Sequence, residues 1–129
     1  MGKPLDVMDF IKGFIWHAYS HYLIENFPGP SDWRWSMLVY RIKKEIGPRF
    51  PEVNFTTWFD WDAPGPQSES VDEAFRVLVF AFEIDCSNRC RTELCNMEQY
   101  RKEWKSITNI ECADTCYEIA RSIDGFFKE

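Results

Sequence analysis

The chain has 129 residues and a formal net charge of −6, and 17% of its residues are aromatic. This length predicts a single globular domain over residues 1–129 with its own hydrophobic core. Because the chain is acidic and has no basic patch, we expect no sequence-independent binding to nucleic-acid phosphates. No apolar run reaches the roughly 20 residues of a membrane span, and the N-terminus lacks the features of a signal peptide, so the expected location is the cytoplasm.

Two helices are predicted in the N-terminal half. The first extends from a cap at Asp6 to about Phe27, because apolar residues recur there at helical spacing. The Pro-Gly-Pro segment that follows ends it. The second begins at Ser31 or Asp32, both good N-cap residues. Its inward face is expected to hold Trp35, Leu38, Val39, Ile42 and Ile46.

Two strands are predicted in the middle of the chain. Residues 53–61 alternate between two types of side chain, the period-two pattern of a strand. A proline- and glycine-rich segment follows, and then the apolar run 75–82 is typical of an interior strand covered on both faces. An alternative remains for the second strand, because Ser70 and Glu73 have the spacing of a capping box that would start a buried helix near Val71.

The C-terminal half predicts two more helices. The third covers residues 88–107, and the fourth begins with the capping-box pair Thr108 and Glu111 and ends at Gly125. The element order is therefore ααββαα. This order predicts an α+β fold, in which a small antiparallel sheet around a central hairpin is packed by about four helices.

The negative charge is concentrated in one region. Between Arg49 and Arg76 there are six acidic residues and no Lys or Arg, so this region accounts for the whole net charge. A strand would place Asp60 and Asp62 on one face, where they would be either a solvated strand end or paired carboxylates for acid–base chemistry. A third interpretation is an aromatic and acidic surface for a basic partner. Its predicted partner-binding residues are Trp58, Asp60, Trp61, Asp62, Glu69, Asp72 and Glu73.

Two histidines and four cysteines are weaker candidates for metal ligands. His17 and His21 are four residues apart on the first predicted helix, a spacing that can hold a transition metal from one face. The competing interpretation is a pair of surface or interface histidines. The cysteines form two Cys-x-x-x-Cys pairs, which we interpret mainly as buried thiols, with disulfides or a thiolate metal site as alternatives. They are Cys86 with Cys90 and Cys112 with Cys116.

These patterns favour a non-enzymatic, acidic inhibitor that binds a protein. In physical type it resembles the immunity proteins that neutralise toxins and the phage proteins that block host defence. The expected partner is a basic protein, such as a toxin or a nucleic-acid-binding effector, and no cofactor is expected. The alternatives are a small metal-binding domain or enzyme that uses His17 and His21 with loop carboxylates, or a structural or regulatory domain that works as an oligomer. The sequence contains neither a glycine-rich phosphate loop nor a Gly-x-Ser-x-Gly motif.

Overall fold

The computed structural model of the chain describes residues 6–22, 27–29, 32–50, 53, 55, 59–62, 65–80, 84–85, 91–94 and 110–127. This part of the chain contains four helices: α1 (Val7–Tyr22), α2 (Trp33–Glu45), α3 (Glu69–Phe80) and α5 (Ile110–Ser122). Its strands are β1 (Phe27–Pro28), β2 (Asp60–Asp62), β3 (Gly65–Gln67), β4 (Ile84–Asp85) and β5 (Arg91–Leu94). None of these helices combines the length and the hydropathy needed to cross a bilayer.

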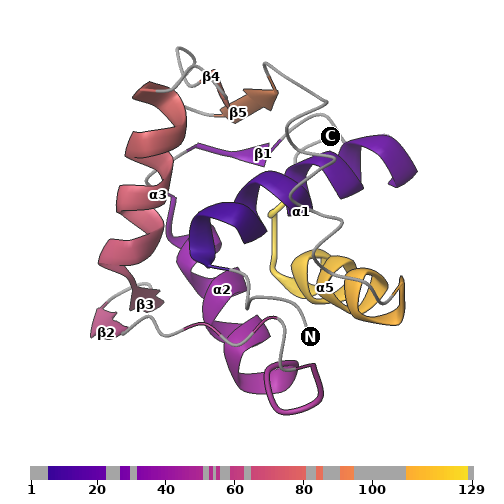
Figure 1. Cartoon of the computed structure of the whole chain (residues 1–129). Coiled ribbons are helices and arrows are strands. Elements are labelled where there is room, and N and C mark those ends of the chain that lie inside the picture. Colours follow the sequence, from indigo (N-terminus) through magenta and orange to yellow (C-terminus); the bar gives the residue numbers. More distant parts are fainter. Residues whose placement is uncertain are drawn as a thin grey trace.

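The four helices surround one core. Helix α1 packs between α3 and α5, and α2 contacts the same two helices (Figure 1). Strands β2 and β3 pair antiparallel beside the end of α3 where that helix begins, and β3 also contacts α2. At the other end of α3, β5 pairs antiparallel with both β1 and β4. The acidic N-terminal turn of α3 therefore lies at one end of the molecule, next to the β2–β3 hairpin.

The predicted α+β fold is wrong. The described part of the chain is mostly helical, and its strands are two to four residues long and form no central sheet. The run from Phe75, predicted as an interior strand, belongs to helix α3 as far as Phe80. The hairpin is instead the short pairing of Asp60–Asp62 with Gly65–Gln67, in which Pro66 lies opposite Trp61. The order ααββαα fails for this reason.

The third predicted helix is also wrong where the structure tests it. Residues Arg91–Leu94 form strand β5 instead of a helix. The rest of the predicted range, 88–90 and 95–107, lies outside the described residues. The run Arg-Thr-Glu-Leu has three polar residues and then one apolar residue, so it lacks the alternation of a strand, and pairing with β1 and β4 decides its conformation.

The other helix boundaries follow from capping groups. The Asp6 carboxylate accepts a hydrogen bond from Asp9 N at 2.8 Å at the start of α1, as the sequence predicts. Asp32 caps α2 by accepting from Arg34 N at 3.0 Å. The hydroxyl of Ser68 accepts a longer bond from Val71 N, 3.4 Å, where α3 begins. After α5 the chain turns at Gly125, whose φ of 70° suits glycine because it has no Cβ.

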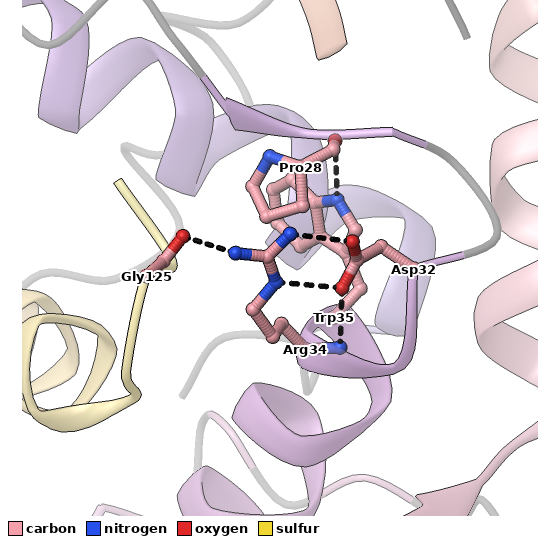
Figure 2. Close-up of polar contacts among 5 residues, drawn as sticks. All are labelled: Pro28, Asp32, Arg34, Trp35 and Gly125. Atoms are coloured by element: carbon pink, nitrogen blue, oxygen red, sulfur yellow. Dashed lines mark hydrogen bonds and ion pairs between the residues drawn. The ribbon is translucent and has the colours of Figure 1, made fainter. Parts of the chain in front are cut away.

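Trp35 is the centre of the core. It is completely buried, and rings from four other segments surround it at centroid distances of 5.0 to 6.3 Å: Phe14, Phe27, Phe75 and Phe126. The indole N–H also donates to the carbonyl oxygen of Pro28 at 2.9 Å, so its polar atom is satisfied inside the core (Figure 2). One side chain therefore joins α1, β1, α3 and the segment after α5 to α2.

A polar contact holds the start of α2 against the end of α5. The Arg34 guanidinium donates to both carboxylate oxygens of Asp32, at 2.6 and 2.7 Å, and to the carbonyl oxygen of Gly125 (Figure 2). Because the paired carboxylate orients the guanidinium, little side-chain freedom remains to be lost in the contact with Gly125. The turn at Gly125 places Phe126 in the core beside Trp35.

Trp35→Phe should destabilise the fold by about 2 to 3 kcal/mol, because it removes ring contacts and leaves the Pro28 carbonyl without its indole donor. Urea denaturation of the purified protein measures the free energy of unfolding. The matched control is Trp33→Phe on the same helix, which should cost less than about 1 kcal/mol since Trp33 is only partly buried. Equal losses in the two variants would contradict the central role of Trp35.

Candidate functional site

Three of the predicted partner-binding residues lie together on α3. Glu69, Asp72 and Glu73 are all exposed in the first turns of the helix, and we call this set the acidic edge. The backbone of Asp60–Asp62 lies at the same end of α3, as β2 of the short hairpin (Figure 1). For β2 only the backbone is described, and Trp58 lies outside the described residues.

The acidic edge keeps its charge exposed to solvent. Within the described residues, neither Glu69 nor Glu73 forms an ion pair with a Lys or Arg. Partial burial raises the pKa of Asp72, and the nearby Arg76 opposes this effect. Negative side chains are favoured at this position because the N-terminal end of a helix carries a partial positive charge. The helix thus stabilises a set of carboxylates that the rest of the described chain leaves accessible.

A second group of acids on α5 has a different electrostatic setting. Glu111 pairs with Arg49 at 2.9 Å, and Glu118 lies 3.9 Å from Arg121. Asp114 accepts a hydrogen bond from the Tyr22 hydroxyl at 2.8 Å. With Thr115, these three acids line an open hollow of about 550 Å³. Sequence analysis missed this surface, although the spacing of the acids on the predicted fourth helix was a visible signal.

The two histidines meet at the junction of α1 with α5. His17 is buried, with its Nε2 3.8 Å from the Oδ1 atom of Asp114, and its ring centroid lies 4.4 Å from that of His21. The Nδ1 atom of His21 lies 3.2 Å from the backbone oxygen of His17. Burial, and then the positive charge of His21, lower the pKa of His17 to about 4, against the opposing effect of Asp114. His17 is therefore neutral at pH 7.

A tyrosine pair completes this junction. The rings of Tyr22 and Tyr117 stack with centroids 3.7 Å apart and planes 5° from parallel. The hydrogen bond to Asp114, followed by desolvation, raises the pKa of Tyr22 to about 12. The hydroxyl therefore stays protonated and continues to donate over the whole neutral range. Nothing in the sequence pairs residue 22 with residue 114, since the contact spans α1 and α5.

The predicted metal ligands are only partly described. Within the described residues, no group of three or more His, Cys, Asp or Glu side chains is placed to hold a metal ion. Cys112 and Cys116 are buried thiols on the inner face of α5, as one of the interpretations of the sequence expected. A hydrogen bond with Cys112, together with burial, raises the pKa of Cys116 well above its ordinary value. Cys86 and Cys90 lie outside the described residues.

Comparison with known proteins assigns no relative: the chain matches no family model, no curated protein and no solved structure. The candidate site therefore rests on the geometry and charge of the chain itself.

The burial of His17 predicts a stability that depends on pH. The folded-state pKa of about 4 lies below the ordinary 6.5, so folding favours the neutral ring. This contribution is complete above pH 6.5 and is lost as the pH falls toward 4. The loss should be on the order of 2 kcal/mol, since solvent around the exposed His21 screens part of the repulsion. Urea denaturation at pH 7 and pH 4.5 measures it.

The matched variants for this measurement are His17→Gln and His21→Gln. Other acids also titrate in this range, so the quantity to compare is the loss of stability relative to the wild type. His17→Gln should lose about 2 kcal/mol less than the wild type on acidification. His21→Gln should fall between the two, because it removes the repulsion from His21 but leaves His17 buried. An identical pH dependence for wild type and His17→Gln would rule out the assignment to His17.

The burial of the two α5 thiols predicts slow alkylation. Iodoacetamide reacts with thiolates, and both Cys112 and Cys116 are 0% exposed, with the pKa of Cys116 raised. Neither should be labelled in the folded protein within the time that fully labels both in urea. Peptide mass spectrometry after timed quenching resolves each position. Equal labelling rates in buffer and in urea would show that these thiols are accessible.

Proposed function

We propose that this protein is a non-enzymatic, cytoplasmic inhibitor that binds a basic protein through the acidic edge. The partner class is a toxin or a nucleic-acid-binding effector whose own basic site is covered in the complex. In this proposal the hairpin residues Asp60, Trp61 and Asp62 extend the acidic edge on the same end of the molecule, and Trp58 adds an aromatic contact.

The observation that carries the proposal is the grouping of three exposed carboxylates at one end of α3, of which Glu69 and Glu73 form no ion pair within the described residues. Like charges held side by side repel one another, and a basic partner relieves that repulsion when it binds. The backbone of β2 lies at the same end of α3, so two further acidic residues of the sequence, Asp60 and Asp62, are near the acidic edge in the fold. A surface of one sign also accelerates encounter with a partner of the opposite sign.

The contrast with α5 supports the choice of surface. Glu111 and Glu118 are already neutralised in part by Arg49 and Arg121, so their field at a distance is weaker. No arginine or lysine among the described residues forms an ion pair with Glu69 or Glu73. The acidic edge is therefore the described surface best able to steer a cationic protein.

The test begins with affinity capture of a basic partner from native extract at low salt, followed by stopped-flow measurement of its association with the purified protein. The edge variant neutralises the three acids of the acidic edge: Glu69→Gln, Asp72→Asn and Glu73→Gln. Association at low salt should slow by about tenfold or more, and the dependence of the rate on salt should weaken, because the steering charge is gone.

A control variant removes the same charge from elsewhere. It neutralises three acids that are each near an arginine in the fold: Glu45→Gln, Glu111→Gln and Glu118→Gln. Its association rate should change by less than about threefold, since paired surface charges contribute little to a long-range field. Circular dichroism of each variant confirms that it is folded. Capture of no basic protein, or equal slowing in both variants, would contradict the proposal.

A further inference from the structure

Two side chains of α1 converge on one oxygen atom of α5. The Tyr22 hydroxyl donates to Asp114 Oδ1 at 2.8 Å, and the Nε2 atom of His17 lies 3.8 Å from the same oxygen. At neutral pH only the tyrosine is within hydrogen-bond distance. His17 is held nearby by burial, whereas the Asp114 side chain is about half exposed and can rotate.

We propose that Asp114 is a shared acceptor. At neutral pH its carboxylate accepts a hydrogen bond from Tyr22, and on acidification it accepts one from His17 instead, which releases the tyrosine from α5. The junction of α1 and α5 is then a device that responds to protons, built from His17, Tyr22 and Asp114. It is independent of the acidic edge, which lies on α3.

The transfer follows from the hydrogen-bonding chemistry of imidazole. A proton taken from solvent makes both ring nitrogens donors, whichever tautomer is present before. The bond from the Tyr22 hydroxyl to Asp114 has one charged partner, whereas the imidazolium–carboxylate bond has two and is therefore the stronger of the two. An approach of about 1 Å brings Nε2 of His17 from 3.8 Å into bonding range of Asp114. The carboxylate oxygen that moves toward His17 moves away from the Tyr22 hydroxyl.

Other titratable groups around His17 determine the pH at which His17 is protonated. On α1, a charged His21 opposes protonation of His17, which places the transfer well below neutral pH. On α5, Asp114 favours protonation of His17, and Glu118 contributes to the raised pKa of Tyr22. The charged side chains of α3, which also packs on α1, are exposed to solvent along its described part: Glu69, Asp72, Glu73 and Arg76.

Release of the hydroxyl changes the exposed end of α1. Tyr22 is 37% exposed and stays in place through its bond to Asp114 and its stacking on Tyr117. With the bond gone, only the stacking on Tyr117 and the edge contact with the His17 ring hold Tyr22, and the last turn of α1 becomes easier to open. The Trp35 core contains no titratable contact of this kind among its rings, so the rest of the fold keeps its packing while this junction loosens.

The test is an NMR titration of the histidine and tyrosine ring signals in the full chain. Tyr22→Phe removes the competing donor, so the Asp114 carboxylate can accept a hydrogen bond from His17 alone. The pKa of His17 should therefore rise by about 1. Asp114→Asn should lower that pKa. In the wild type the Tyr22 ring signals should shift with the same midpoint as His17, and in His17→Gln that shift should disappear.

A role of Tyr22 in packing alone would leave the pKa of His17 unchanged or lower in Tyr22→Phe. That result, or Tyr22 signals that shift equally in the wild type and in His17→Gln, would overturn the proposal. Tyr22→Phe keeps the ring and its stacking, so the test does not depend on whether Asp114→Asn folds.

Discussion

The packing of aromatic rings around Trp35 is the interaction on which the rest of the structure depends. The indole contacts rings from α1, from β1, from α3 and from the segment after α5. Except for β1, which precedes α2 closely, these segments are far from Trp35 in the sequence, so the shared contact and not a short loop sets their positions. Each large ring removes apolar area from water and also restricts its neighbours to an edge-on or offset arrangement. The orientation of α3, and with it the direction in which the acidic edge faces, is a consequence of where Phe75 meets Trp35.

The two acidic helix surfaces illustrate how much the surroundings of a carboxylate matter. Residues of the same type stand at similar spacing on α3 and on α5, yet the α5 acids contact Arg49, Arg121 and Tyr22. Glu69 and Glu73 are instead exposed and form no ion pair with a described cation. The first group stabilises the contacts between helices, and the second contributes a field that extends beyond the molecule. Counting charges along the chain does not separate these cases, because the partner of Glu111 lies in the turn after α2 and that of Asp114 lies on α1.

Residues near the α3 start explain why the strand prediction failed. The run from Phe75 is rich in β-branched and aromatic residues, which favours a strand, but the pattern before it is helical: Val71, Ala74 and Phe75 are buried while Asp72, Glu73 and Arg76 are exposed. The strand prediction considered only the apolar residues from Phe75 onward, and so it did not include the helical spacing of the residues before them. The alternative helix from near Val71 is correct, although its cap is Ser68 and not Ser70. Val53 and Phe55 are also buried, as a half-buried strand would require, but Val53 has 3₁₀-helical and not strand conformation.

The sequence by itself determined the helices that carry their own start signals, and their inner faces: Asp6 for α1, Asp32 for α2, and the apolar positions of α5 from Cys112 to Ile123. It also located the acids near the start of α3, because the absence of Lys and Arg between 49 and 76 is a property of the chain alone. Only the tertiary structure decided which acids are neutralised, that His17 is buried against α5, and that one oxygen of Asp114 lies near both Tyr22 and His17. The physical reason is range: caps and helical periodicity act within a few residues, whereas desolvation and shared hydrogen bonds depend on groups about a hundred positions away that packing brings together.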